Sequence, residues 1–469
     1  MSTYAAQAAI FLITFSSTIV VARLVSPRDF GVFAMANAVS TVINVFMQFG
    51  LAKYVMRESE LDRDTLRSLF TVNVLMTLLY VGAILVGSAT AGRLFGSVEV
   101  GRFLLVFALF PLLGMLEFIP SAICARDMRF GIVSVISVAK ATVTAIATIV
   151  LASRGHAYMS FAWGQILGWA VTATCYNAVV WRPDVWRLRF KGIRSILHFG
   201  SQMIGISGLA NLSTRAGEML LGSFLGLASL GLYTRASSLP TTLYQNIYGA
   251  GSNVIFSKLS HDLREQGAFH ETYVRFMRLL LGLLWPMMIG LAILAQPVIH
   301  LLYGPKWQAA ATPLSLLTLA SAVTIAIGMV AEVFILRHET KQQVRIEAIR
   351  SGAGIGLFAL GALVSLPLAA AAKLAEALLA FLLYRRPMNR LVGGPAGELR
   401  RVYAEGLLVS AAAVLPALGL MLWTRFSPET GLLPIIASVL AGVLLWSLLL
   451  LRRKHPIATE ILALVNRVR

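Results

Sequence analysis

The 469-residue chain is 58% hydrophobic, with a mean hydropathy of +0.78, and each of its hydrophilic stretches is short. This composition excludes a soluble protein and indicates an integral membrane protein. The formal charge of +19 does not indicate nucleic-acid binding, because the basic residues are scattered between apolar runs. Cys124 and Cys175 both lie in apolar runs, so we expect neither a disulfide nor a metal site.

Apolar runs of about twenty residues predict an all-α polytopic membrane protein with about 14 transmembrane helices. The runs of the first half are 4–22, 30–51, 69–91, 103–124, 131–152 and 158–180. Those of the second half are 198–225, 230–255, 276–298, 310–335, 347–365, 367–384, 403–424 and 432–451. Pro367 alone separates 347–365 from 367–384, so about twelve spans is the alternative. The first run starts abruptly at about Tyr4, which suggests that native residues precede this sequence.

An internal repeat relates the two halves, because residues 18–41 align with 218–241 without a gap. Each copy predicts a helix, a turn of about six residues and a second helix, with Asp29 and Ser229 as candidate N-caps. The repeat suggests two related halves. Its identical pairs include Gly31 with Gly231, Ala36 with Ala236 and Thr41 with Thr241.

Between the halves, residues 181–195 interleave Trp181, Trp186 and Phe190 with basic residues. This pattern is typical of a segment on the inner leaflet, and its place as a connector favours a hinge. The basic tail 452–469 has apolar residues at helical spacing and is expected to behave similarly.

The distribution of charge predicts the topology. With a cytoplasmic N-terminus, the inner loops collect about 29 Lys and Arg and the outer loops about seven, a strong positive-inside bias. Both termini are therefore expected in the cytoplasm. The outer loops are short, which counts against an outer-face glycan polymerase or ligase. No GxxxxGK[ST] loop or HExxH helix is present, so we expect neither ATP hydrolysis nor zinc chemistry, no cofactor, and energy from a gradient or from the substrate.

Charged residues inside the spans are the candidate functional residues, because ionised groups in a bilayer turn toward a watery interior. Asn211, Arg215 and Glu218 share one helical face. Arg215 and Glu218, at i and i+3, could instead form a structural pair. Arg235 has no acidic neighbour within a helical turn, which favours a place in a central cavity.

Lys140 is a third cavity candidate, since a polar stripe shares its helical face. The alternatives for Lys140 are snorkelling to the interface or a buried pair with Glu117. The stripe consists of Ser134, Ser137, Thr144 and Thr148.

Two further sets of charges predict structural roles. Lys373 and Glu376, at i and i+3, predict a self-neutralised pair. Glu332 is expected to be an interfacial carboxylate near Arg337. The cavity candidates thus lean cationic, which suits anionic cargo, and arginine in particular matches phosphate oxygens.

Four motifs resemble one family of membrane proteins. The motifs are VVARLVSPRDFGVFAM (20–35), ICARDMRF (123–130), HFGSQM (198–203) and GEMLLGSFLGLASLGLYTRASSLP (217–240). Through them the chain resembles the oligosaccharide flippases of the multidrug, oligosaccharidyl-lipid and polysaccharide exporter superfamily, especially the exopolysaccharide branch.

The resemblance implies two six-helix lobes with two added C-terminal helices. The implied parts are an N-terminal lobe at 1–180, a basic interfacial linker at 181–197, a C-terminal lobe at 198–384, two extra helices at 385–451 and a basic tail at 452–469.

The resemblance also implies a function, which is translocation of undecaprenyl-diphosphate-linked sugar repeat units across the bacterial inner membrane by alternating access. Lys140, Arg215 and Arg235 would hold the diphosphate, and Arg23 and Arg28 would lie near the outer rim. Membrane lipids, a glycan polymerase and a chain-length regulator are the expected partners, with H⁺ or Na⁺ as candidate coupling ions. The alternatives are a multidrug antiporter, a glycan polymerase or ligase, and a scaffold that transports nothing.

Overall fold

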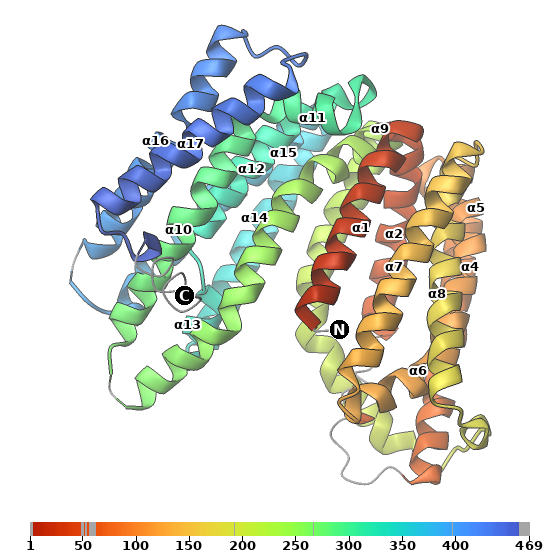
Figure 1. Cartoon of the computed structure of the whole chain (residues 1–469). Coiled ribbons are helices and arrows are strands. Elements are labelled where there is room, and N and C mark those ends of the chain that lie inside the picture. The colour runs from red at the N-terminus through yellow and green to blue at the C-terminus, as the bar shows by residue number, and fades with distance from the viewer. Residues whose placement is uncertain are drawn as a thin grey trace. The chain divides into compact units, whose positions relative to one another are not determined.

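The computed structural model in Figure 1 describes residues 3–47, 51, 54–55, 62–191, 193–265, 267–395 and 397–458. Within these ranges, it leaves undescribed the side chains of 3–4, 45–47, 195, 197–214, 250 and 253. Every regular element of the described residues is a helix, which confirms the predicted all-α class. The chain divides into two compact units, Met1–Gly231 (unit 1) and Leu232–Arg469 (unit 2).

Unit 1 is built mainly from long apolar helices with short connections. Within it, α7 packs against α1 and α8, and α6 packs against α4 and α8. Its elements are α1 (Thr3–Leu24), α2 (Pro27–Met47), α4 (Arg63–Phe95), α5 (Val98–Phe107), α6 (Leu109–Arg126), α7 (Phe130–Ser153), α8 (Met159–Val179), η1 (Pro183–Val185) and the first part of α9 (Ile193–Arg264).

Unit 2 begins inside α9 and continues to the C-terminus. Within it, α10 packs against α12 and α16, α15 packs against α12 and α14, and α16 packs against α17. Its further elements are α10 (Phe269–Ile293), α11 (Ala295–Tyr303), η2 (Pro305–Ala310), α12 (Ala311–Ile325), α13 (Val330–Leu336), α14 (Thr340–Val364), α15 (Leu366–Val392), α16 (Glu398–Trp423) and α17 (Leu432–Arg452).

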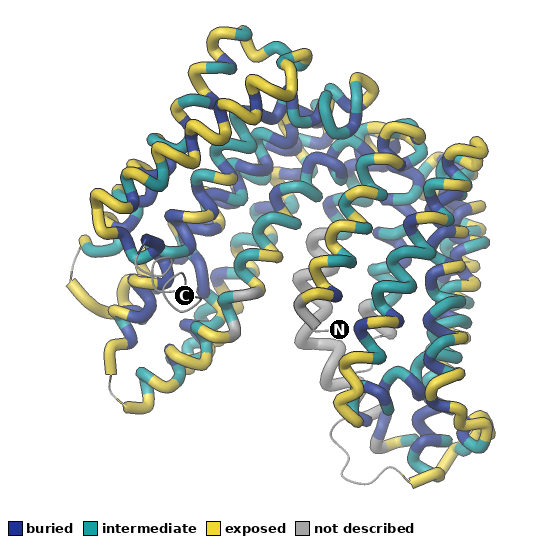
Figure 2. Tube along the Cα trace, viewed as in Figure 1, coloured by how far each residue is buried: buried dark blue, intermediate teal, exposed yellow. Residues whose placement is uncertain are grey.

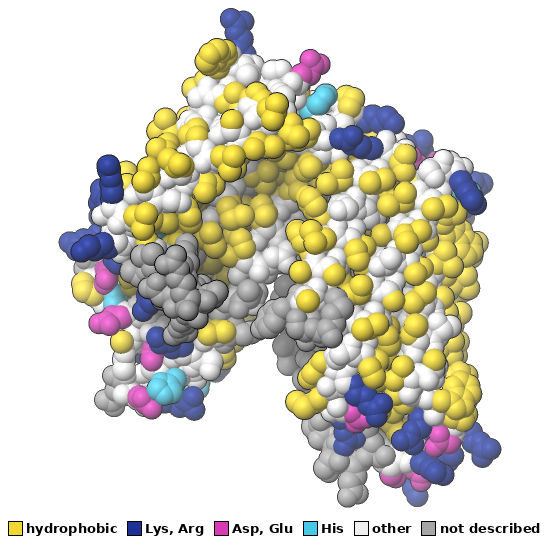
Figure 3. Space-filling view, viewed as in Figure 1, with side chains coloured by type: hydrophobic (Ala, Val, Ile, Leu, Met, Phe, Trp, Pro, Cys, Tyr) yellow, Lys and Arg dark blue, Asp and Glu magenta, His cyan; other side chains and the backbone are white. Residues whose placement is uncertain are grey.

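The surfaces of both units suit a bilayer. Exposed positions alternate with buried ones along α16 and α17 (Figure 2), and many of the exposed ones are leucines. On the face shown in Figure 3, hydrophobic side chains cover the middle of the helices, while most Lys and Arg side chains lie toward helix ends. This outward apolar surface is what hydrocarbon tails require.

Where they are described, the predicted spans are helical, although 103–124, 276–298 and 310–335 each cross a helix break. Among the described residues, 11 segments are long and apolar enough to cross a membrane. Runs 198–225 and 230–255 both lie on α9. The separation at Pro367 is confirmed, because α14 ends at Val364 and Ser365 Oγ caps α15 by accepting the Leu368 N–H at 3.4 Å. The count of fourteen spans and the predicted domain boundaries stay predictions.

The internal repeat appears as reciprocal packing inside unit 1. A Cβ built on Gly31 would lie 1.7 Å from the carbonyl oxygen of Leu227. A Cβ built on Gly231 would lie 1.9 Å from the carbonyl oxygen of Pro27. The two glycines are 200 positions apart (231 − 31), and so are their partners (227 − 27). The copies therefore touch through equivalent positions, as a local two-fold relation between them would produce.

The turns of the two copies differ from the prediction. Ser26 Oγ accepts the Asp29 N–H at 3.1 Å, and the Asp29 carboxylate accepts the Ser26 N–H at 3.3 Å. In this capping box Ser26 is the N-cap, so the assignment to Asp29 was wrong. Ser229 is not an N-cap either, because its hydroxyl donates to a carbonyl one turn earlier at 3.0 Å. The turn of about six residues was also wrong, since only Gly226, with φ 81°, leaves the helical conformation in the second copy.

We predict that Gly31→Ala and Gly231→Ala each destabilise the protein. An added methyl group would meet rigid backbone, and overpacking of this kind costs about 1–3 kcal/mol. Thermal unfolding of purified protein in detergent measures the loss. Gly82→Ala is the matched control, because a Cβ on Gly82 of α4 meets no atom within 4 Å. Equal melting temperatures for all the variants would contradict the close packing.

One predicted span, 103–124, consists of two helices. α5 and α6 meet at Ala108, three residues before Pro111. Proline has no N–H to donate to the carbonyl of Phe107, and its ring clashes with that group. The interruption therefore follows from the sequence, although the prediction did not use it.

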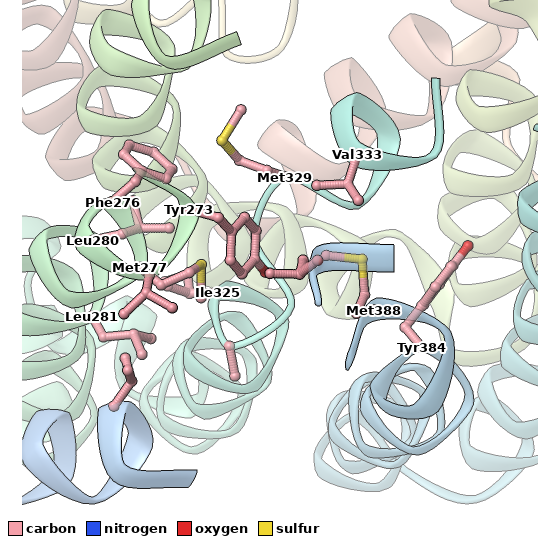
Figure 4. Packing of buried hydrophobic residues seen from close by; sticks show 14 of the residues in the cluster. Tyr273, Phe276, Met277, Leu280, Leu281, Ile325, Met329, Val333, Tyr384 and Met388 are labelled. Carbon is pink, nitrogen blue, oxygen red and sulfur yellow. The ribbon is translucent and has the colours of Figure 1, made fainter. Parts of the chain in front are cut away.

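The predicted span 310–335 is also interrupted. α12 ends at Ile325, α13 begins at Val330, and Met329 between them has a left-handed φ of 60°. Figure 4 shows Tyr273 inside the buried apolar cluster that surrounds this break. The carbonyl groups at the break accept hydrogen bonds from aromatic side chains: Trp285 Nε1 to Ala322 at 2.8 Å, Tyr403 Oη to Ala326 at 3.0 Å and Tyr273 Oη to Gly328 at 3.2 Å.

The basic segment after α8 is fastened to the start of α4. Val185 is buried, while Trp181, Trp186 and Phe190 stay exposed, as expected of an interfacial segment. Hydrogen bonds hold residues 184–191 to α4 in this conformation, and the hinge stays a prediction. The bonds run from Arg67 Nε to the Asp184 carbonyl at 2.9 Å, from Ser68 Oγ to the Lys191 carbonyl at 2.7 Å, and from the Arg189 N–H to Thr71 Oγ1 at 2.7 Å.

The first part of the predicted tail folds against α10, whereas 459–469 lies outside the described residues. His455 is buried beside Gly282, and its Nδ1 accepts the Ile457 N–H at 3.3 Å. Burial lowers the pKa of His455, Arg278 lowers it further, and Glu405 opposes the shift. The neutral imidazole is therefore the form that fits the fold.

We predict that acidification weakens this anchor. Because the pKa is lower in the folded state, the stabilisation is complete above the unfolded value of about 6.5 and is lost as the pH falls below it. His455→Asn keeps an acceptor but has no proton to gain, so its melting temperature should fall less between pH 7.5 and 5.5, two values on either side of about 6.5. An equal fall of the melting temperature in wild type and variant would show that protonation of His455 does not weaken the anchor.

Candidate functional site

Arg215 and Glu218 form an ion pair on the part of α9 that belongs to unit 1. Arg215 Nη1 donates to Glu218 Oε2 at 2.7 Å, and the two side chains are 30% and 11% exposed. This is the structural pair that the sequence left open. Since Glu218 already neutralises Arg215, an anionic ligand would have to share or replace that carboxylate. The side chain of Asn211, predicted on the same face, lies outside the described residues.

Arg235 lies on the part of α9 that belongs to unit 2. It is 6% exposed, and its guanidinium carbon is 5.8 Å from the centre of the Tyr303 ring. A guanidinium at this distance gains cation–π attraction. A ligand could reach so buried a group only in a conformation that uncovers it.

Lys140 of α7 is half-buried inside unit 1. Its Nζ lies 3.2 Å from the centre of the Trp169 ring on α8, and Glu117 of α6 is within electrostatic reach. Two members of the predicted polar stripe serve helix packing: Thr148 fills the space above Gly164, and Thr144 the space above Gly168. Small residues of this kind let two membrane helices approach closely.

The two predicted rim residues are both exposed. Arg28 donates from Nη2 to Glu99 Oε1 at 2.8 Å, a partner the prediction did not foresee. Arg23 lies at the end of α1. The convergence of Lys140, Arg215 and Arg235 on one chamber, with Arg23 and Arg28 at its rim, stays a prediction.

The predicted pair of Lys373 and Glu376 is confirmed, with Nζ to Oε2 at 2.8 Å. The pair belongs to a larger network, because Arg350 of α14 binds both the buried Glu376 and Glu347. Tyr384 Oη also donates to Glu347 at 3.1 Å. The prediction missed Arg350 and Glu347, although their i, i+3 spacing at the start of a span was a usable signal.

Glu332, expected near Arg337, has a different partner. Tyr248 Oη donates to Glu332 Oε1 at 2.9 Å, and Tyr244 stacks on Tyr248 with ring centres 5.0 Å apart. The guanidinium of Arg337 lies over the Phe269 ring at 4.5 Å. Tyr248 lies 84 residues before Glu332 in the chain, so no local sequence pattern could predict this contact.

No group of three or more His, Cys, Asp and Glu side chains that could hold a metal occurs among the described residues. Cys124 and Cys175 are free thiols. The candidate residues of the described chain are therefore cations on apolar helices. A carboxylate contacts Arg215, and aromatic rings contact Arg235 and Lys140.

Long apolar helices carrying buried charges define a membrane transporter fold, and known structures agree. The chain superposes on the lipid II flippase MurJ in an inward closed conformation with a TM-score of 0.75, at 16% identity over 95% of this chain and 97% of that one. A multidrug resistance MATE family transporter in an inward-facing conformation gives a TM-score of 0.59, at 15% identity over 81% and 95%.

Sequence comparison then gives the family. The chain belongs to the polysaccharide biosynthesis protein family, whose model matches residues 20–312, and this confirms the predicted resemblance. It is 24% identical to the succinoglycan biosynthesis transport protein ExoT of Rhizobium meliloti, over 67% of this chain and 63% of that protein. It is 20% identical to the lipopolysaccharide biosynthesis protein WzxC of Escherichia coli, over 64% and 61%. The matches thus span just over three fifths of these two relatives.

We predict that Glu376→Ala unfolds more readily than wild type. The change leaves Lys373 and part of Arg350 without their acid, and removing one member of a buried ion group costs about 3–5 kcal/mol. Lys373→Ala/Glu376→Ala should recover part of the loss, because Arg350 keeps Glu347. Chemical denaturation in micelles measures both. Glu429→Ala, at an exposed position after α16, is the control and should leave the stability unchanged. An equal loss of stability in Glu429→Ala would contradict the role of the buried ion group.

Proposed function

We propose that this protein is a flippase for undecaprenyl-diphosphate-linked oligosaccharide repeat units. It would carry them across the bacterial inner membrane for exopolysaccharide, O-antigen or lipopolysaccharide assembly. The observation that carries the proposal is the match to the polysaccharide biosynthesis family, joined to a fold shared over 95% of the chain with a lipid II flippase. Relatives named for succinoglycan transport and lipopolysaccharide biosynthesis support the same cargo class.

The charges inside the helices support an anionic cargo. Lys140, Arg215 and Arg235 are cationic side chains within apolar helices. A diphosphate offers oxygens that a guanidinium can bind in pairs. We propose that it competes with Glu218 for Arg215, and that Lys140 and Arg235 complete the site in a conformation that exposes them. Exchange of one acidic partner for another avoids leaving a bare guanidinium in an apolar interior.

Alternating access is the proposed mechanism, as in transporters built from internal repeats. The lipid tail stays in the bilayer and no covalent bond is made or broken. From the positive-inside bias we propose that both termini are cytoplasmic. A glycan polymerase and a chain-length regulator are proposed partners, and a gradient of H⁺ or Na⁺ is the proposed energy source.

Drug antiport is the second candidate, because the fold also matches a multidrug transporter with a TM-score of 0.59. The charge favours the flippase. An antiporter for organic cations needs an acidic site, whereas Glu218 is paired with Arg215, Glu376 with Lys373 and Arg350, and Glu117 lies near the Lys140 cation. Susceptibility of a deletion strain to cationic drugs separates the two functions.

We predict that Arg235→Ala and Arg215→Ala abolish surface polysaccharide in a complemented deletion strain. Loss of one charge-assisted pair of hydrogen bonds to a phosphate costs about 1.5–3 kcal/mol, a reduction in binding of about tenfold or more. Flipping of a fluorescent undecaprenyl-diphosphate oligosaccharide in proteoliposomes measures the same loss directly.

Arg154→Gln is the matched control, since Arg154 is an exposed residue at the end of α7 and should support normal export. Immunoblots of membranes must show equal amounts of each variant. Normal export by both alanine variants at equal abundance would overturn the site. Unchanged polysaccharide in the deletion strain, together with new drug sensitivity, would overturn the flippase function in favour of the antiporter.

A further inference from the structure

A polar cluster inside unit 1 surrounds the middle of α6. Pro120 has no N–H, so the carbonyl of Leu116 lacks its helical donor. Asn177 of α8 supplies the donor instead, from Nδ2 at 3.0 Å. Asn73 of α4 donates from Nδ2 to the neighbouring carbonyl of Met115 at 3.2 Å. Side chains from two helices thus hold α6 at the turn that carries Glu117.

Glu117 follows Leu116 directly on α6, and Thr172 of α8 and Lys140 of α7 lie near its side chain. Its Oε2 is sealed from solvent and accepts no hydrogen bond from the described residues. The nearby cation does not satisfy it, because Lys140 Nζ lies over the Trp169 ring at 3.2 Å. A buried carboxylate oxygen without a donor is costly in its ionised form, and protonation removes the charge and with it the larger part of that cost.

The groups near Glu117 come from helices packed against α6. Lys140 of α7 and Tyr176 and Thr172 of α8 are within reach of it. On α6 itself the thiol of Cys124 lies two turns away. Lys140 is thus the cation placed to hold an ionised Glu117, once it leaves the Trp169 ring.

Glu376 in unit 2 provides an internal contrast. It is buried, and Arg350 and Lys373 bind its two oxygens. Two membrane carboxylates of one chain therefore have different surroundings: Glu376 has two cationic partners, and Glu117 Oε2 has no hydrogen-bond partner among the described residues. Groups whose surroundings differ in this way are suited to different roles.

We propose that Glu117 is a proton-binding site of unit 1, protonated in the conformation described here. When water enters the cluster, the O–H bond breaks and the proton passes to that water. The electron pair stays on the carboxylate, which then pairs with the Lys140 ammonium. Proton binding is inferred from the sealed Glu117 Oε2 and the position of Lys140. Its coupling to glycan translocation rests on the proposed function.

Infrared spectroscopy of the full-length protein in lipid nanodiscs tests proton binding without any substrate. At neutral pH the wild type should show the C=O stretching band of a protonated carboxyl group. Glu117→Gln should lose this band, Glu117→Asp should keep a shifted one, and Glu376→Gln should leave it unchanged. Glu117→Gln copies the shape of the protonated acid and is expected to fold. A wild-type spectrum identical to that of Glu117→Gln would overturn the proposal.

A second experiment tests the coupling. In proteoliposomes, flipping by the wild type should change with an imposed pH gradient, while flipping by Glu117→Gln should not. Equal gradient dependence of both proteins would overturn the coupling. Wild-type proteoliposomes that show the infrared band but never flip a lipid-linked glycan would overturn the proposed function and leave the proton site standing. The two failures are therefore distinguishable.

Discussion

Backbone groups inside a bilayer must find hydrogen-bond partners within the protein, and this constraint decides how the helices are interrupted. At two places, side chains of neighbouring helices donate to carbonyl groups that an interrupted or proline-containing helix leaves without a donor. Asn177 serves the carbonyl freed by Pro120, while Trp285, Tyr273 and Tyr403 serve the break between α12 and α13. Such contacts join helices far apart in sequence, so each interruption also becomes a point where the bundle is held together.

Charged side chains inside the bilayer also need partners within the protein, and an unpaired charge there costs more free energy than an unpaired backbone group. Arg215 is held by Glu218, and Glu376 by Lys373 and Arg350. Lys140 has the face of Trp169 in place of an acid. A cation paired with a carboxylate can exchange that acid for another anion without being left unpaired in an apolar interior. That property connects the buried ion pairs to a proposed anionic cargo, and it makes Glu117, with its unsatisfied oxygen, stand out.

Much of the fold could be predicted because span length and apolarity are local properties. The runs, the break at Pro367 and the two-copy repeat were all readable, and the repeat reappears as reciprocal contacts of Gly31 and Gly231. Helix starts were less predictable. Ser26 and Asp29 form one capping box, and the sequence alone did not show which of the two is the cap. Within the site, only pairs at i, i+3 could be foreseen, as for Lys373 with Glu376.

By itself the sequence determined the membrane class, the all-helical fold and the family, since these depend on composition, periodicity and motifs. Beyond the i, i+3 pairs, only the tertiary structure decided which partners the buried charges received, because those partners come from helices distant along the chain. Arg350 completes the Glu376 network, Tyr248 binds Glu332, and Lys140 faces Trp169. The reason is physical: apolarity is a property of a segment, whereas a hydrogen bond between helices depends on how the segments pack.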